Sequence, residues 1–169
     1  MIPVIFGVLI ALLINNWNDG RKEKTYLDQV YASIEQELED SLLDIQRVIP
    51  KQLAAVDTLQ AYLNDDGVSL YEITIKSNGV HMPTIKTTSW NAISSSRIDL
   101  LAYEKLSALA DIEERKENLR SRIERQMDFT FQNFENTERS KKEILNMMIL
   151  DVVGAEKSLM ARIEELTNN

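Results

Sequence analysis

The chain has 169 residues, a formal net charge of −8 and no cysteine. Its length suits a single domain with its own core. The acidic balance argues against a nucleic-acid partner, and the lack of cysteine excludes disulfides, thiol catalysis and cysteine-based zinc sites. Only 5 glycines and 3 prolines interrupt the sequence, which predicts long helices rather than many short strands.

The first 18 residues carry no charged side chain, and residues 1–14 are apolar throughout. As a helix they would be about 21 Å long, against about 30 Å for the hydrocarbon core of a bilayer. We expect residues 1–18 to form a transmembrane anchor, with an aromatic residue at the membrane interface. The anchor side chains are expected to be Val4, Ile5, Phe6, Val8, Leu9, Ile10, Leu12, Leu13, Ile14 and Trp17.

Two other interpretations of this segment stay open. A secretory signal peptide would begin with Lys or Arg and end at a small-residue cleavage site, and neither feature is present. A helix buried in a soluble bundle would more often show a polar face, whereas apolar residues surround the axis here. The anchor interpretation explains more of the segment.

The stretch "FGVLIALLINNWNDGRKEK" (residues 6–24) resembles the signature of an uncharacterised family of bacterial single-pass membrane proteins. In that family a "GILIAL-INNWNE" type segment closes an N-terminal transmembrane helix and leads into a helical domain. The matching positions are Gly7, Leu9, Ile10, Ala11, Leu12, Ile14, Asn15, Asn16, Trp17 and Asn18. A weaker resemblance covers residues 87–109. Family members usually carry a basic segment before the anchor, so we expect the anchor to be truncated at its N-terminus.

Two signals disagree about orientation. Arg21, Lys22 and Lys24 follow the anchor closely, and the positive-inside rule alone would place the following domain in the cytoplasm. The resemblance implies the opposite topology. We follow the resemblance and expect a single-pass protein of the bacterial inner membrane with a periplasmic C-terminal domain.

Residues 19–169 are expected to form one helical domain. Apolar residues recur every three or four positions over residues 21–49, which predicts a long helix. Pro50 is expected to break or kink the chain, because an internal proline removes a helical hydrogen bond, and a shorter helix is predicted over 51–64. Residues 68–88 are rich in Ile, Thr and Val and contain the hairpin signal Asn78-Gly79. They are expected to form a small β-hairpin or an extended loop.

The second half of the chain is predicted to be helical as well. A short helix around 89–95 is expected to place Trp90 in the core, and long helices are predicted over 102–134 and 140–167. Each long helix has one apolar stripe that must be buried against other helices. The predicted fold is therefore all-α, an elongated antiparallel bundle of the four-helix type that continues from the anchor. A coiled-coil dimer is the alternative packing of the first and last helices.

No catalytic, cofactor-binding or metal-binding residue is predicted. The only histidine, His81, lies in a polar loop and is expected to face solvent. Residues 94–96 are three serines without a supporting base, and they are expected to end a helix. The acidic clusters at 35–40 and 111–114 are expected to be solvated helix faces rather than cation sites.

Two clusters of large side chains could line an apolar cavity. They are the phenylalanines at 129–134 and the methionines at 147–148. Packing in the core is the expected role of both clusters.

These observations favour a non-enzymatic, membrane-anchored helical domain. Its expected partners are membrane lipid and either another envelope protein or a second copy of the chain, and no nucleic acid or cofactor is expected. An extracytoplasmic ligand-sensing bundle that acts through a partner is the alternative. A soluble helical protein with a buried N-terminal helix is a third interpretation.

Overall fold

The fold consists of helices. The computed structural model describes the backbone of residues 2–168 and the side chains of residues 14–168. Within that range the chain forms α-helices, one 3-10 helix and no strand: α1 (Ile2–Ala61), α2 (Leu70–Lys76), α3 (Thr88–Ser96), η1 (Ile98–Leu100), α4 (Tyr103–Gln132) and α5 (Arg139–Thr167). The prediction of an all-α fold is confirmed, and α4 and α5 have bounds close to the expected ones.

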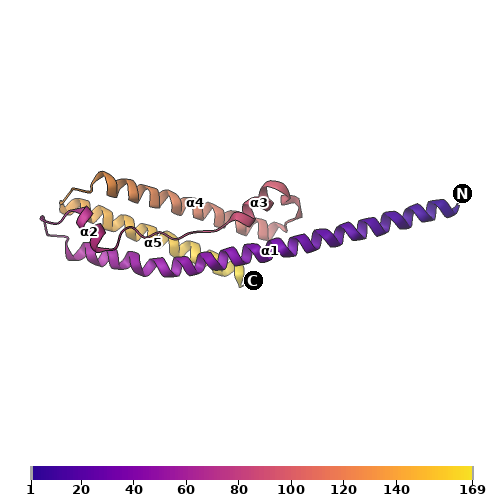
Figure 1. The fold of residues 1–169 in the computed structure, drawn as a ribbon, viewed down its shortest axis with the longest axis horizontal. Coiled ribbons are helices and arrows are strands. Elements are labelled where there is room, and N and C mark those ends of the chain that lie inside the picture. The colour runs from indigo at the N-terminus through magenta and orange to yellow at the C-terminus, as the bar shows by residue number, and fades with distance from the viewer. Residues whose placement is uncertain (1, 169) are drawn as a thin grey trace.

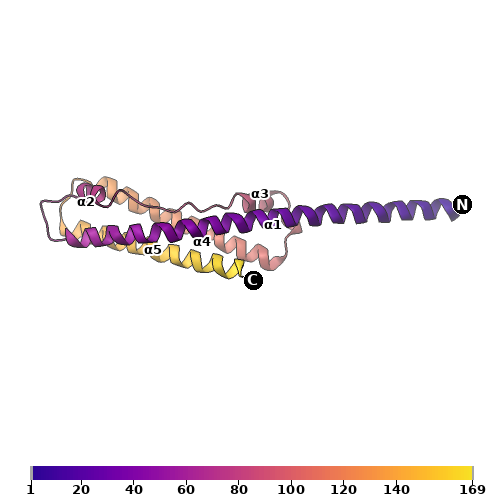
Figure 2. The same cartoon turned by 60° about the horizontal axis from the view of Figure 1, so that its bottom comes forward.

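Three long helices lie side by side along the bundle (Figures 1 and 2). α1 and α4 run in the same direction, and α5 runs the opposite way and packs against both. Between α1 and α4 the chain returns along the bundle as α2, an extended segment of residues 77–87, and α3. We call residues 77–87 the strap. The order is up-down-up-down, with α2, the strap and α3 in the place of the second helix of a four-helix bundle.

The core follows the predicted apolar stripes. Side chains from α1, α4 and α5 meet along the bundle axis, and Trp90 of α3 joins them, as predicted, with 7% of its surface exposed. The most completely buried apolar residues are Ile45, Leu59, Leu70, Ile73, Ile93, Ile112, Leu119, Val152, Leu159 and Ile163. Burying such a side chain contributes about 1.5–3 kcal/mol, so these contacts hold the three long helices together.

The predicted helix boundary at Pro50 is wrong, because α1 continues through this residue to Ala61. Pro50 lies on the exposed face of α1, where water can satisfy the carbonyl that loses its helical partner. Ile45 and Leu59 on either side of it are buried in the core. Tertiary packing thus overrides the local penalty. The expected helices over 21–49 and 51–64 are one helix, so three long helices form the bundle where four were counted.

The β-hairpin considered for residues 68–88 is also wrong. Ser69 begins α2 instead: its hydroxyl accepts a hydrogen bond from the Glu72 backbone N–H, and the Glu72 carboxylate accepts one from the Ser69 N–H. This reciprocal pair is a capping box. Asn78 and Gly79 adopt φ of 60° and 92°, but they terminate α2, because the Gly79 N–H bonds to the Thr74 carbonyl. The alternative, an extended loop, holds for the strap.

The N-terminal part of α1 projects beyond the bundle (Figure 1). The helix has 60 residues and is therefore about 90 Å long. All side chains from residue 14 to residue 26 are exposed. The first ion pair from α1 to another element joins Glu23 to Arg97 at 2.9 Å. The segment of α1 before the bundle is thus a continuous helical extension of it.

At the opposite end of the bundle, a buried lysine binds backbone carbonyls that follow α1. Lys142 of α5 has no exposed surface, and its ammonium group donates hydrogen bonds to the carbonyls of Tyr62 and Asp65, at 3.1 and 2.6 Å. These carbonyls follow the last residue of α1, where the helix dipole favours a cation. The contact fixes the start of α5 against the end of α1.

Candidate functional site

The candidate site is the seam between α1 and the strap. A row of polar residues on α1 faces the strap at spacings of four, three and eight positions: Glu37, Ser41, Asp44 and Gln52. Such spacings place residues on one side of a helix. Residues 80–86 of the strap make no helical or sheet hydrogen bonds, so their backbone polar groups need partners elsewhere. The polar row of α1 supplies them.

The middle of the strap is held by two side-chain oxygens of α1. The Thr84 backbone N–H donates to the Asp44 carboxylate at 2.7 Å, and the Lys86 N–H donates to the Ser41 hydroxyl at 2.9 Å. The Lys86 ammonium group also pairs with Asp40 at 2.8 Å. Backbone groups of the strap therefore bind side chains in a fixed register along α1.

The strap ends at the start of α3, where α1 provides a carboxylate. Glu37 accepts hydrogen bonds from the Ser89 backbone N–H, at 3.0 and 3.2 Å, and from the Ser89 hydroxyl, at 2.9 Å. Free N–H groups and the helix dipole favour an anion at a helix N-terminus. On the other side, Lys116 of α4 donates to the Thr87 hydroxyl at 2.8 Å. The strap is thus tied to both α1 and α4.

The contacts of this seam shift the pKa values of its charged side chains. The Thr84 N–H, followed by the Arg47 guanidinium, lowers the pKa of Asp44. The hydrogen bond from Lys86, followed by the one from Gln36, lowers the pKa of Asp40. The same contact raises the pKa of Lys86. All three shifts favour the charged forms, so this part of the seam is an electrostatic contact that requires ionised carboxylates.

At its other end the seam contains a buried polar cluster. The Gln52 side-chain amide donates to the His81 carbonyl at 3.0 Å and to the Glu156 carboxyl at 2.8 Å. Glu156 has no exposed surface, and Gln52 has 4%. Burial raises the pKa of Glu156 to about 7, and the hydrogen bond from Gln52 opposes that shift. This carboxyl therefore exchanges its proton near neutral pH.

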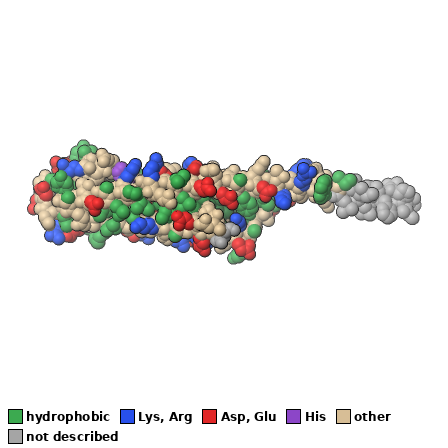
Figure 3. Space-filling view, turned by 90° about the horizontal axis from the view of Figure 1, so that it is seen from below, with side chains coloured by type: hydrophobic (Ala, Val, Ile, Leu, Met, Phe, Trp, Pro, Cys, Tyr) green, Lys and Arg blue, Asp and Glu red, His purple; other side chains and the backbone are tan. Residues whose placement is uncertain are grey.

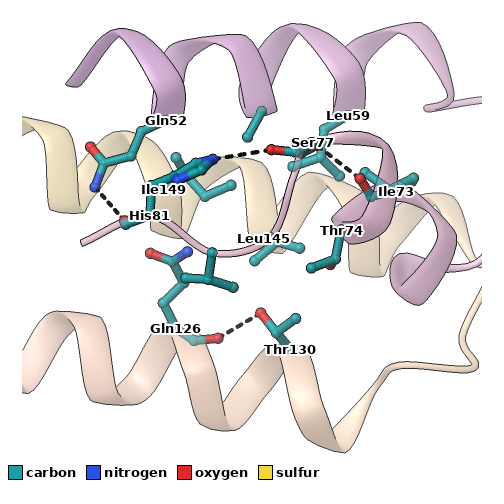
Figure 4. A pocket seen from close by; sticks show the side chains of 13 residues that line it. Gln52, Leu59, Ile73, Thr74, Ser77, His81, Gln126, Thr130, Leu145 and Ile149 are labelled. Carbon is teal, nitrogen blue, oxygen red and sulfur yellow. Dashed lines mark hydrogen bonds between the residues drawn. The ribbon is translucent and has the colours of Figure 1, made fainter. Parts of the chain in front are cut away.

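A small cavity lies beside Gln52 (Figure 4). Its volume is about 30 Å³, which is enough for one water molecule. The side chain of Gln126 points into it from α4, and the His81 ring on the strap bonds through Nε2 to the Ser77 carbonyl at 3.1 Å. Its remaining walls are mostly apolar, with Leu145 and Ile149 of α5 among them. The cavity is thus lined by the buried side-chain amides of Gln52 and Gln126, and its other walls are mostly apolar.

The arrangement can bind and release a proton. Burial raises the pKa of Glu156 to about 7 and keeps its carboxyl away from solvent. The His81 ring is half-buried rather than facing solvent as predicted, and it is bonded to backbone. Among the described residues no group of three or more acidic or histidine side chains could hold a metal ion.

The serines at 94–96 lie in the last turn of α3. Their hydroxyls donate to the carbonyls of Asn91 and Ala92 in the same helix. They therefore end a helix, as predicted.

The acidic cluster at 35–40 departs in part from the predicted solvated helix face. Glu37 and Asp40 bind the strap and α3, as described above, so the 35–40 cluster is in part a structural contact. Asp111 pairs with Arg115 one turn away at 3.0 Å. On the face shown in Figure 3, acidic and basic side chains are interspersed with hydrophobic ones, as in a solvated helical surface.

The prediction that the aromatic and methionine clusters pack in the core is wrong for two residues. Phe131 is 56% exposed and Met147 is 60% exposed. Phe131 stacks edge-on against Phe134, which stacks in turn against Tyr71 of α2, with ring centroids 5.1 and 5.6 Å apart. These rings form an exposed aromatic cluster at the end of the bundle away from the N-terminus of α1.

Most of the predicted anchor side chains, those from Val4 to Leu13, lie outside the described side chains. Ile14 and Trp17 are described, and they are 59% and 69% exposed on the projecting part of α1. Among the described residues, no helix combines the length and the apolar character needed to cross a bilayer.

The polar row on α1 was not predicted from the sequence. Its signal is the helical spacing of Glu37, Ser41, Asp44 and Gln52 beside the apolar stripe of the same helix. Polar residues that only face solvent do not need such a regular spacing. Glu156 has a similar signal, because it interrupts the apolar stripe of α5 between Val152 and Leu159.

No protein-family model matches this chain, and no curated protein or solved structure does.

Proposed function

We propose that the chain is a non-enzymatic, membrane-anchored helical domain that engages a second protein chain at the bacterial cell envelope. The observation that carries the proposal is the course of α1. Residues 2–18 of the uncharged segment belong to the same helix as the first long element of the bundle and extend away from it. An apolar segment placed outside the core needs another apolar environment.

The boundary of the anchor is supported by the exposed residues that follow it. Ile14 and Trp17 are exposed, and charged residues begin at Asp19. An exposed tryptophan between an apolar and a charged segment is typical of a membrane interface. In this proposal α1 enters the inner membrane and the bundle stands on the periplasmic side.

Carbonate extraction of membranes tests the anchor, with the full chain produced in bacterial cells. A variant with Leu9→Asp and Leu13→Asp places two charges in the apolar segment, each costing about 2.5–3.5 kcal/mol in a membrane. The matched control is Leu43→Asp, which changes a leucine that is 65% exposed on the bundle. We expect the wild type and the control to resist extraction and the double variant to be released. Release of the wild type would overturn the proposal.

A reporter that is active only outside the cytoplasm, fused after Asn169, tests the orientation. Activity supports the periplasmic placement of the bundle. An intact but inactive fusion on an extraction-resistant protein would reverse the orientation, and Arg21, Lys22 and Lys24 would then be the true topology signal.

The partner interaction is supported by the aromatic cluster at the far end of the bundle. Tyr71 and Phe131 are 48% and 56% exposed, beside the exposed Ile75 of α2. Clustered exposed aromatic residues are enriched in protein interfaces. Site-specific photocrosslinking from position 131 in cells tests this, with Ser121 on the exposed surface of α4 as the control position. A discrete protein adduct from position 131 alone is expected, and equal labelling from both positions would contradict it.

A ligand-sensing bundle is the second candidate, and the cavity beside Gln52 favours it. Two buried amides, those of Gln52 and Gln126, line a space inside an apolar surround, as in small-molecule sites. Its volume of about 30 Å³ would require the strap to move for anything larger than water. Native mass spectrometry of the purified full chain tests this candidate. A co-purifying small molecule lost on Gln126→Leu substitution supports it, and ligand-free protein argues for the first proposal.

A further inference from the structure

The buried pair of Gln52 and Glu156 is incomplete in its hydrogen bonds. Both amide hydrogens of Gln52 have acceptors, one on the strap and one on α5. The amide oxygen Oε1 of Gln52 and the carboxyl oxygen Oε2 of Glu156 are both buried and have no hydrogen-bond partner among the residues whose side chains the structure describes. Each such atom costs about 1–3 kcal/mol if it stays unpaired. Two acceptors without a donor therefore lie within one buried contact.

A single proton on Glu156 would satisfy both atoms. An ionised carboxyl only accepts hydrogen bonds, whereas a protonated one also donates through its O–H group. With the proton on Oε2, the carboxyl can donate to Gln52 Oε1 while Glu156 Oε1 continues to accept from the Gln52 amide. The two side chains then form a cyclic acid–amide pair with two hydrogen bonds. An ionised Glu156 would instead place a buried negative charge beside the Gln52 oxygen, which is unfavourable.

We propose that Glu156 and Gln52 form a proton-operated latch that controls the strap. In the protonated state the acid–amide pair orients Gln52, whose second amide hydrogen holds the His81 carbonyl, so that α1, α5 and the strap are joined through one side chain. Loss of the proton favours a state in which water reaches the carboxylate. Gly79, Val80 and His81 of the strap line the cavity beside Gln52, and in this proposal the strap separates from Gln52 when water enters.

The charged side chains around Gln52 and Glu156 bond to other groups or are exposed. The protonation of Glu156 itself therefore controls the proposed latch. On the strap, the His81 ring is bonded to the Ser77 carbonyl. On α4, Arg115 bonds to Asp111 and Ser158, Lys116 to Thr87 and Glu113, and Arg122 to Asp151 of α5. On α1, Arg47 pairs with Asp44, and Lys51 is exposed, as is Lys157 on α5. The raised pKa of Glu156 has burial as its main cause, in agreement with a carboxyl that pairs with no cation in the described part of the chain.

Hydrogen–deuterium exchange of the strap tests the latch, using the full chain in a non-ionic detergent. The reporters are the backbone amides of Thr84 and Lys86, which bond to α1, with rates normalised to the intrinsic exchange rate at each pH. Between about pH 5 and about pH 8 we expect the normalised exchange of the wild type to rise by about tenfold or more. Unchanged protection of these amides across this range would overturn the proposal.

Two variants separate the latch from a general effect of pH. Glu156→Gln stays uncharged and can form the same two-bond pair with Gln52, so its strap exchange should be flat across the range. The control Glu143→Gln removes an exposed carboxylate of α5 that pairs with Arg139, and it should keep the wild-type rise. A rise of equal size in Glu156→Gln would exclude Glu156 as the cause.

A direct titration keeps the proposal testable even if a variant folds poorly. Carbon-13 NMR of labelled glutamate in the wild-type chain follows the protonation of the Glu156 carboxyl, and the absent signal in Glu156→Gln assigns it. We expect this carboxyl to titrate near neutrality, in the pH range where strap exchange rises. Titration close to the ordinary glutamate value, or in a range separate from the strap transition, would refute the latch.

Discussion

The ammonium nitrogen of Lys142 lies 2.6 Å from the carbonyl oxygen of Asp65, with no part of the lysine side chain exposed. A buried cation is costly unless it is well bonded. Here it binds the carbonyls of Tyr62 and Asp65 just after α1, which also accept the backbone N–H groups of Asp65 and Val68. The two ends of the bundle are therefore different: a polar clasp joins α1 to α5 at one end, and α1 alone continues beyond the other.

Replacing this lysine tests the clasp. In Lys142→Met the carbonyls of Tyr62 and Asp65 lose the buried ammonium donor, while the aliphatic volume is kept. We expect the free energy of unfolding to fall by about 2–3 kcal/mol, measured by urea denaturation. Lys157→Met, at an exposed position on the same helix, should change stability by less than about 0.5 kcal/mol. Equal effects of the two substitutions would contradict the role of the clasp.

The buried carboxyl of Glu156 predicts how stability depends on pH. Its pKa is raised from 4.5 to about 7 in the folded chain. The folded state therefore binds this proton more tightly than the unfolded state. The stabilisation is complete below about pH 4.5 and is lost as the pH rises through about 7, with an upper limit of about 3 kcal/mol.

Urea denaturation at a series of pH values measures this loss. In Glu156→Gln the decline between about pH 5 and about pH 8 should largely disappear, because the amide does not titrate. A decline of the wild-type size in that variant would assign the pH dependence to other groups.

The carboxylate of Asp44 predicts an effect in the acid range. The Thr84 N–H lowers the pKa of Asp44 below its ordinary value of 3.8. This contribution is present above about pH 3.8 and is lost as the pH falls through the folded-state pKa. Asp44→Ala should cost about 1–3 kcal/mol at neutral pH, the value of a hydrogen bond to a charged group.

Asp28→Ala, at an exposed position of α1, is the control. Denaturation measured at neutral pH and in acid should show that the difference between Asp44→Ala and the wild type shrinks in acid. A constant difference would mean that Asp44 acts through packing rather than through charge.

Pro50 predicts a stabilising substitution. It lies inside α1 on the exposed face and removes one backbone hydrogen bond. Pro50→Ala restores the donor and has a better helix propensity, so we expect a gain of up to about 3 kcal/mol in the free energy of unfolding. Thermal unfolding followed by circular dichroism measures it, with the neighbouring exposed Lys51→Ala as control. A loss of stability would show that the proline shapes α1 for the packing of Gln52.

The sequence predicted the parts of the fold that depend on local pattern. The apolar period of α4 and α5 gave their bounds closely, and the same reasoning placed Trp90 in the core. The prediction was wrong at Pro50 and at residues 68–88, because tertiary packing overrides the local signals at these positions. The capping box of Ser69 and Glu72 was a readable signal for α2, whereas Asn78-Gly79 is ambiguous because positive φ values serve both hairpins and helix ends.

By itself, the sequence determined that the chain is helical, that its long helices are amphipathic, and that an uncharged apolar segment precedes them. These properties follow from residue spacing along one helix. Only the tertiary structure decided that α2, the strap and α3 replace a helix, that the polar row of α1 binds the strap, and that Glu156 meets Gln52. Residues 104 positions apart come together through the packing of α1 against α5, and the burial that raises the pKa of Glu156 exists only once those helices have met.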